Sequence, residues 1–128
     1  DGVPRHVPPL HRAWQLQKRA ARVGFDWSDI RDVFVKLEEE IGELRDAIAR
    51  KNRKHVIEEL GDLMFSVVNV ARFMKVDPAY ALELTNAKFS RRFRVVEEEI
   101  TGSGRRMKDC TLAEMDAIWD RLRAEDKR

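Results

Sequence analysis

Apolar side chains recur at every third or fourth position through most of the chain, which is the spacing of an amphipathic helix. This period predicts five helices, at about residues 9–23, 29–50, 54–75, 78–100 and 112–122. Asp77 followed by Pro78, and a capping box running from Thr111 to Glu114, are typical helix starts. No segment alternates polar and apolar residues with a period of two, so the pattern predicts an all-α fold.

An acidic motif occurs twice, as LEEEIGEL at residues 37–44 and as VIEELGDL at residues 56–63. Each copy carries two carboxylates three residues apart, which a helix places about one turn from each other. Because the connection between the two helices is short, they are predicted to be antiparallel neighbours whose acidic edges meet at one rim. Unpaired anions converge in a stable protein only around a cation. The repeat therefore predicts a metal site formed by Glu40, Glu43, Glu59 and Asp62.

The alternative is that these acidic residues merely coat a helix surface. The repeat argues against it, because Gly42 and Gly61 also match and an interior glycine costs roughly 1 kcal/mol of helix stability. Such glycines leave room for a neighbouring helix or a ligand beside the acids. An all-oxygen ligand set with no histidine at ligand spacing favours Mg²⁺ or Mn²⁺. Since Mg²⁺ commonly shares its coordination sphere with phosphate oxygens, the predicted ion implies a substrate that carries phosphate.

Candidate phosphate-binding residues follow on the fourth predicted helix. Lys88 and Arg92 lie four positions apart at one edge of its apolar stripe, and Asn86 is nearby. From this edge both cations can reach one polyphosphate, whereas the alternative is a solvated basic face. Trp119 and Arg123 repeat the four-residue spacing on the last helix. Trp119 is either a core residue or an aromatic wall near a base.

Composition narrows the class of partner. The 128 residues suffice for one domain. With a formal net charge of +2 and interleaved acids and bases, the chain has no bulk field that would draw it to nucleic acid or to a membrane. The longest apolar run, residues 63–71, is too short to span a bilayer, and no Gly-x-x-x-x-Gly-Lys loop is present. The single cysteine, Cys110, suits a reducing compartment such as the cytoplasm.

Two further features bear on what surrounds this domain. Three of the four prolines precede residue 10, which is typical of an interdomain linker. Residues 1–9 are therefore predicted to be linker-like and residues 10–128 to form the domain, within a longer protein. Large apolar residues outside the main stripes, such as Val68 and Phe73, predict exposed patches and hence a homodimer or a higher homo-oligomer.

Taken together, these segments resemble the MazG-type nucleoside triphosphate pyrophosphohydrolases of the all-α NTP pyrophosphatase superfamily. The resemblance covers nearly the whole chain beyond residue 9. It rests on Glu39-Glu40-x-x-Glu43, Glu59-x-x-Asp62, residues 16–27, the stretch Asn86-x-Lys88-Phe89-x-x-Arg92-Phe93, and Trp119 with Arg123. It is strongest to the carboxy-terminal MazG domain of two-domain bacterial proteins. The resemblance implies a four-helix core with an extra C-terminal helix, assembled as a dimer or a higher oligomer.

The same resemblance implies an activity and roles for the site residues. Members of this family hydrolyse nucleoside triphosphates to nucleoside monophosphate and pyrophosphate, with Mg²⁺ held by the paired carboxylates. The implied metal ligands are Glu40, Glu43, Glu59 and Asp62, and the implied substrate contacts are Asn86, Lys88, Arg92, Trp119 and Arg123. Glu39 or Glu58 is expected to accept the proton of the attacking water.

Two other classes of function explain part of this pattern. A helical binding module would use the acidic rim to hold a structural ion or a basic partner, but it leaves the cations on another helix unexplained. A nucleic-acid binder would use Arg105, Arg106 and Lys108, but the acidic centre would repel phosphates in the absence of a metal. Release of pyrophosphate from a nucleoside triphosphate in the presence of Mg²⁺ distinguishes the enzyme from both.

Overall fold

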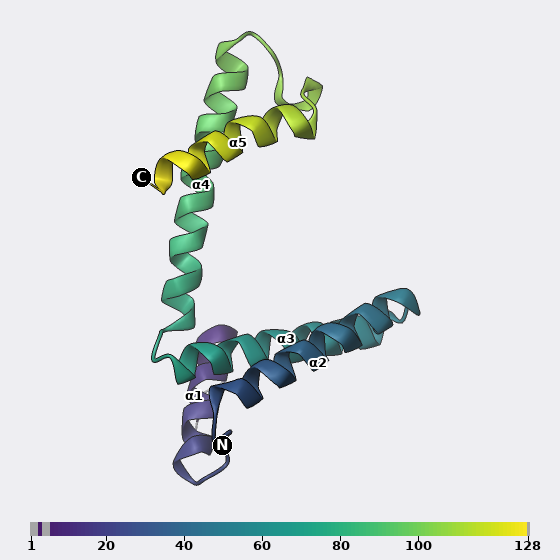
Figure 1. Ribbon diagram of the computed structural model, residues 1–128, viewed down its shortest axis with the longest axis vertical. Helices are drawn as coiled ribbons and strands as arrows, with labels where there is room; N and C mark the ends of the chain where they lie inside the picture. Colours follow the sequence, from purple (N-terminus) through teal and green to yellow (C-terminus); the bar gives the residue numbers. More distant parts are fainter. Residues whose placement is uncertain (1–2, 4–5, 128) are drawn as a thin grey trace. The chain divides into compact units, whose positions relative to one another are not determined.

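A computed structural model describes residue 3 and residues 6–127 of the chain (Figure 1). Its elements are α1 (Pro9–Arg22), α2 (Ile30–Ala49), α3 (Arg53–Phe73), α4 (Pro78–Gly102), the short 3₁₀-helix η1 (Met107–Asp109) and α5 (Leu112–Asp126). No strand occurs among the described residues, so the all-α prediction is confirmed. Of the predicted linker-like segment, residues 1, 2, 4 and 5 lie outside the described part, as does residue 128 at the end of the predicted domain.

Side-chain caps set the starts of α2, α3, α4 and α5, whereas α1 begins at Pro9 without one. Asp29, Asn52 and Asp77 each accept a hydrogen bond from a backbone N–H of the following turn, at 2.8, 3.2 and 2.9 Å. The predicted capping box forms at α5, where Thr111 and Glu114 each accept a hydrogen bond from the other's backbone N–H. These caps satisfy N–H groups that have no partner within the helix, so the helices begin where the short polar residues stand.

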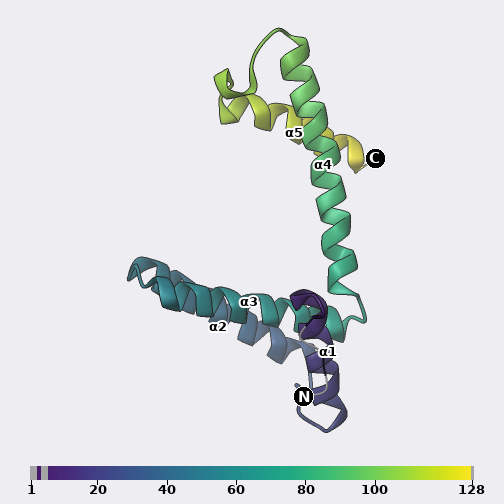
Figure 2. The same ribbon diagram turned by 180° about the vertical axis from the view of Figure 1, so that it is seen from behind.

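The chain forms two compact units, Asp1–Ala81 and Leu82–Arg128. In the first unit, α2 and α3 lie side by side and run antiparallel, and α1 packs on α3 (Figure 1, Figure 2). Val33 of α2 and Val68 of α3 are fully buried. The Gln17 side-chain amide of α1 donates a hydrogen bond to the backbone carbonyl of Phe65 at 2.9 Å. This bond and the apolar contacts fix α1 against α3.

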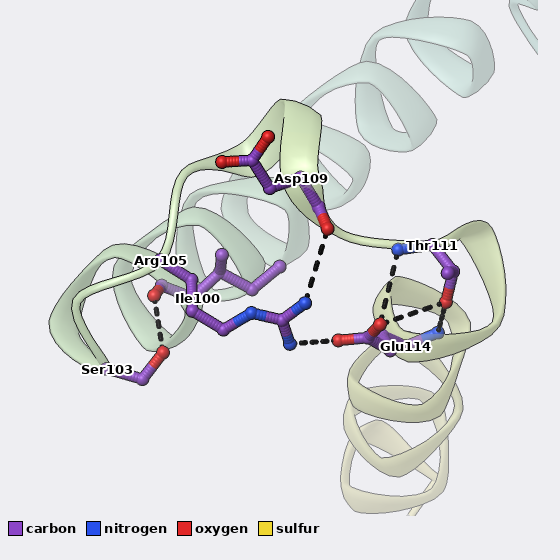
Figure 3. Close-up of polar contacts among 6 residues, drawn as sticks. All are labelled: Ile100, Ser103, Arg105, Asp109, Thr111 and Glu114. Carbon is purple, nitrogen blue, oxygen red and sulfur yellow. Dashed lines mark hydrogen bonds and ion pairs between the residues drawn. The ribbon is translucent and has the colours of Figure 1, made fainter.

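In the second unit, α5 crosses α4, with the Trp119 ring 5.2 Å from the Phe89 ring between their centroids. Polar contacts tie the connection from α4 to α5 together (Figure 3). The Arg105 guanidinium pairs with Glu114 of the capping box and donates to the backbone carbonyl of Asp109 at 3.3 Å. Arg105 therefore links the 3₁₀-helix η1, which the periodicity did not predict, to the start of α5.

Large apolar side chains remain exposed on the first unit. Phe34, Leu60, Met64 and Val67 lie on the predicted inward faces of α2 and α3, yet each is about half exposed in the single chain. An unpartnered apolar surface of this kind is typical of an interaction face. None of the helices in the described ranges is long and apolar enough to cross a membrane.

One sequence expectation about this surface is wrong. Val68 was expected off the main apolar stripe of its helix and therefore exposed, but it is 1% exposed. The physical reason is that α3 contacts two helices, α2 and α1, so residues outside the face that packs on α2 are also covered. Phe73, the second residue of this kind, is half-buried at the end of α3.

Candidate active site

The two copies of the acidic motif lie on facing parts of α2 and α3. Glu40, Glu43 and Glu59 each offer a carboxylate oxygen, and these oxygens lie within 4.8 Å of one another. Antiparallel packing of two helices that carry the same motif brings the residues together, because each helix presents its acids on the same edge of its apolar stripe. Asp62 is outside this group of three, but it lines a cavity together with Glu40.

The three grouped carboxylates differ in burial. Glu40 is 3% exposed, Glu59 is half-buried and Glu43 is exposed. The Oε2 atoms of Glu40 and Glu59 are buried and have no hydrogen-bond partner among the described residues. Buried carboxylate oxygens without donors are costly unless a proton or a cation satisfies them. This donor set, composed of oxygen alone, fits a hard divalent cation.

Because Glu40 and Glu59 lie close together, the pKa values of their carboxyl groups shift in opposite directions. Hydrogen bonding to Glu40 and then to Glu43, followed by burial and like charge, raises the pKa of the Glu59 carboxyl to about 7. Burial acts to raise the pKa of Glu40, but hydrogen bonds with Lys36 and Glu59 outweigh it and lower that pKa. Glu40 is therefore the ionised member near neutral pH, whereas Glu59 still carries its proton in about half of the molecules at pH 7.

Lys36 is a member of this site that the sequence analysis missed. Its Nζ lies 3.0 Å from Glu40 Oε1 and 3.7 Å from Glu39 Oε2, and these contacts raise the pKa of Lys36. The signal was available, because a lysine four residues before a glutamate on a helix faces it one turn away.

Glu39, the residue expected to act as the general base, lies outside the carboxylate group. Its side chain is about half exposed and pairs with Lys36. Glu58, the alternative base, is exposed on α3. The two matched glycines, Gly42 and Gly61, face open space, and a Cβ atom added at either position meets nothing within 4 Å. Close approach of another element of the described chain therefore does not account for these glycines.

A cavity of about 700 Å³ adjoins the carboxylates within the first unit. Glu40, Asp62 and Lys36 contribute to its wall, together with residues of α1, of the turn at 24–27 and of the end of α3. The volume lies within the range of about 300–1,000 Å³ that is usual for small-molecule sites. The cavity therefore has room for a ligand that contacts the acidic group.

The residues expected to contact the substrate all lie in the second unit. Asn86, Lys88 and Arg123 are exposed, whereas Arg92 is 9% exposed. The structure brings Arg92 and Trp119 together, with the guanidinium carbon 5.6 Å from the centre of the indole ring. Trp119 also contacts Phe89, so its ring is half-buried rather than free.

Asp126 is a second residue that the sequence analysis missed. Its Oδ2 lies 2.8 Å from both Nε and Nη2 of Arg92 and 2.8 Å from Nη2 of Arg91. A hydrogen bond with Arg92 lowers the pKa of Asp126, and a second one with Arg91 adds to this effect. Burial acts in the opposite direction but is outweighed. No local spacing signals this contact, because Asp126 stands more than thirty residues from its partners in the sequence.

Comparison with known proteins matches residues 30–96, more than half of the chain, to the MazG nucleotide pyrophosphohydrolase domain. The chain is 40% identical over 121 residues to the nucleoside triphosphate pyrophosphohydrolase/pyrophosphatase MazG of Thermotoga maritima, covering 94% of this chain and 46% of that protein. It is 38% identical over 130 residues to the nucleoside triphosphate pyrophosphohydrolase of Escherichia coli K12, covering 98% of this chain and 49% of that protein.

A third relative is the uncharacterized protein YabN of Bacillus subtilis. The two sequences are 41% identical over 129 residues, and the match covers 26% of YabN. The chain thus spans about half the length of the first two relatives and a quarter of the third. Its match to the domain includes both copies of the acidic motif as well as Lys88 and Arg92. The family resemblance read from the sequence is confirmed: this chain belongs to the MazG nucleotide pyrophosphohydrolase domain family.

Proposed function

We propose that this chain hydrolyses nucleoside triphosphates to nucleoside monophosphate and pyrophosphate with the help of Mg²⁺. The observation that carries the proposal is the group of carboxylate oxygens from both motif copies within 4.8 Å of one another. It lies beside a cavity that can receive a ligand, in a chain of a pyrophosphohydrolase family. The names of the relatives from Thermotoga maritima and Escherichia coli support the same activity, although each of those proteins is about twice as long as the match.

The metal ligands in this proposal are Glu40, Glu43, Glu59 and Asp62. The first three bring their oxygens together, and Asp62 reaches the same cavity as Glu40. When bound, Mg²⁺ (or Mn²⁺ as a substitute) neutralises phosphate charge and lowers the pKa of a coordinated water. Glu59 must release its proton for binding, because a carboxylate coordinates a cation only in its ionised form. Lys36 keeps Glu40 ionised through their ion pair.

The remaining roles are assigned to residues outside the group of three carboxylates. Glu39 accepts the proton of the attacking water, with Glu58 as the alternative base. Lys88 and Arg92 stabilise the charge that develops on the leaving pyrophosphate, and Asn86 and Arg123 contribute polar contacts. The Trp119 ring, already stacked beside the Arg92 guanidinium, forms an aromatic wall.

The proposal also covers assembly and compartment. The half-exposed apolar side chains of α2 and α3 support a homodimer or a higher homo-oligomer. The free thiol of Cys110 supports function in the reducing environment of the cytoplasm. We propose neither nucleic acid nor a membrane as a partner, since the formal net charge is only +2.

A product assay tests this function. The protein is incubated with each ribonucleoside and deoxyribonucleoside triphosphate and Mg²⁺, and the products are separated by ion-exchange chromatography. We expect nucleoside monophosphate and pyrophosphate in equal amounts. Nucleoside diphosphate and orthophosphate as primary products would contradict the proposed reaction. Mg²⁺ binding without turnover of any triphosphate would favour the rival hypothesis of a helical metal-binding module.

A further inference from the structure

The cavity beside the carboxylates extends along α3 beyond the metal-binding residues. Asn69 lies seven residues after Asp62, which is about two helical turns, or roughly 10 Å, further along the same face of α3. Both side chains line the cavity. A ligand whose phosphates lie at Asp62 can therefore extend towards Asn69 with its other end.

Asn69 presents a hydrogen-bond donor of fixed orientation. Arg72 Nη2 donates to Asn69 Oδ1 at 3.0 Å. Because a guanidinium has only donors, the amide oxygen must face Arg72, and the Nδ2 group with its two hydrogens is directed away from it. Arg72 thus determines the orientation of the amide, which otherwise has two equivalent positions.

Arg72 is itself held by a two-point ion pair. Its Nη1 and Nη2 atoms lie 3.0 and 2.6 Å from the two carboxylate oxygens of Asp26, in the turn between α1 and α2. The Asp26 carboxylate also accepts a hydrogen bond from the backbone N–H of Trp27 at 2.8 Å. The Arg72 side chain is 12% exposed, so the pair is largely shielded from water. One ion pair therefore positions both Asn69 and the segment that carries Trp27.

Asn69 and Trp27 complement each other chemically at the cavity wall. Both residues line the cavity, and the Trp27 side chain is partly exposed rather than packed in a core. An indole ring offers a surface on which a planar heterocycle can stack, and a fixed amide N–H offers a donor to an acceptor on the edge of that heterocycle. A phosphate or a ribose can accept a hydrogen bond from the amide, but the planar nucleobase is the part of a nucleotide that both accepts this bond and stacks on the indole ring.

We infer that this part of the cavity binds the nucleobase of the triphosphate, with Asn69 Nδ2 donating to an acceptor atom of the base and Trp27 forming an aromatic wall. Asp26 and Arg72 are positioning residues that fix these two groups. The inference rests on the proposed function for the identity of the substrate. It assigns base selection to the first unit, on the same helix as Glu59 and Asp62.

The test is the substitution Asn69→Asp, which keeps the oxygen that accepts from Arg72 and replaces the amide donor by a second oxygen. Its matched control is Asn52→Asp, because Asn52 caps α3 outside the cavity and aspartate caps a helix equally well. For the four common ribonucleoside triphosphates, kcat/KM is measured with each variant. We expect Asn69→Asp to lower kcat/KM for the preferred base by about 10-fold or more and to change the ratios between bases. Asn52→Asp should leave these ratios unchanged.

The ratios distinguish base recognition from structural damage. A purely structural role of Asn69, or added negative charge near the phosphates, would lower kcat/KM for all four substrates by a similar factor, and equal ratios would overturn the inference. If Asn69→Asp does not fold, Trp27→Ala serves as the second variant, since Trp27 is 43% exposed and does not belong to the buried core. Unchanged ratios in Trp27→Ala would overturn the inference in that case.

A binding measurement separates this inference from the proposed function. Nucleosides without phosphate are added in the absence of metal, and saturation-transfer NMR is recorded on the base protons. We expect transfer that Asn69→Asp reduces several-fold and Asn52→Asp does not. If no triphosphate is hydrolysed but this transfer occurs, the proposed function fails and the cavity assignment stands. If triphosphates are hydrolysed but no transfer that depends on Asn69 is detected, the proposed function stands and the cavity assignment fails.

Discussion

Lys36 and Glu40 form an ion pair along α2, with Lys36 Nζ 3.0 Å from Glu40 Oε1. The Glu40 side chain is 4% exposed, so its charge is compensated by this lysine and not by solvent. Lys36 thereby allows one carboxylate of the cluster to stay ionised before any metal ion arrives. Of the two less exposed carboxyl groups, Glu40 is thus ionised with a compensating partner, and Glu59 has a raised pKa.

Replacement of Lys36 tests this compensation. Lys36→Met keeps the aliphatic stem and removes the charge, which leaves the buried Glu40 carboxylate without its partner. We expect the free energy of unfolding of the metal-free protein to fall by about 1 kcal/mol, a small value because Lys36 itself is 41% exposed. Urea unfolding at pH 7 measures it, with Lys36→Arg as the control that preserves charge. An unchanged unfolding midpoint in Lys36→Met would mean that solvent already compensates Glu40.

Removal of a carboxylate is expected to separate activity from stability. Glu59→Ala and Asp62→Ala should abolish pyrophosphate release because each removes a proposed metal ligand. Without metal the stability should hold or rise, since each substitution relieves repulsion within the acidic cluster. Pyrophosphate assay and thermal unfolding in a chelator measure the two effects. Glu38→Ala, on the exposed side of α2, is the matched control; turnover like that of the unaltered protein in Asp62→Ala would end the metal assignment.

The ion pair of Asp26 with Arg72 should make stability depend on pH in the acid range. Hydrogen bonding to Arg72, opposed by burial, lowers the pKa of Asp26 below its ordinary value of 3.8. The contribution to stability is therefore fully present above about pH 4 and is lost as the pH falls through the lowered pKa. Asp26→Asn should be less stable than the unaltered chain at pH 7 and should lose less stability between pH 5 and pH 2. Urea unfolding at several pH values checks this, and parallel curves for the two proteins would contradict it.

Lys88 and Arg92, the two cations of α4 that are proposed to contact the substrate, are expected to raise kcat. Lys88→Ala and Arg92→Ala should lower kcat by a factor of about 10² or more if they stabilise the leaving pyrophosphate. Arg91→Ala is the matched control, because Arg91 is an exposed neighbour that also pairs with Asp126. It should retain most of the activity. Normal kinetics of both Lys88→Ala and Arg92→Ala would leave α4 with only a solvated basic face.

The exposed apolar surface of α2 and α3 should be buried by self-association. We expect a dimer or a higher oligomer by light scattering at micromolar concentration, because isolated apolar patches of this extent are unfavourable in water. Met64→Glu, at a side chain that is 55% exposed, should shift the population towards the monomer. A fully active monomer of the unaltered chain would refute the assembly.

What the sequence determined by itself is local. The starts of α2 to α5 follow from short polar residues that cap backbone N–H groups within one turn, as at Asp77 and Thr111. The pairing of Glu40 with Glu43 on one helix edge follows from the helical repeat, and the duplicated motif pointed to the facing edge of α3. Family membership could also be read from these motifs. Each of these inferences depends on residues close in the chain, where helical geometry fixes their relative directions.

What only the tertiary structure decided depends on residues far apart in the chain. Asp26 meets Arg72 across 46 positions, and Asp126 meets Arg92 across 34, with no periodic signal in either case. The packing angle and the offset between α2 and α3 brought Glu59 to Glu40 and Glu43 and placed Asp62 at the cavity wall instead. Contact of α3 with α1 buried Val68. Such contacts depend on how helices pack, and a helical repeat specifies which face of a helix is apolar but not which partner covers it.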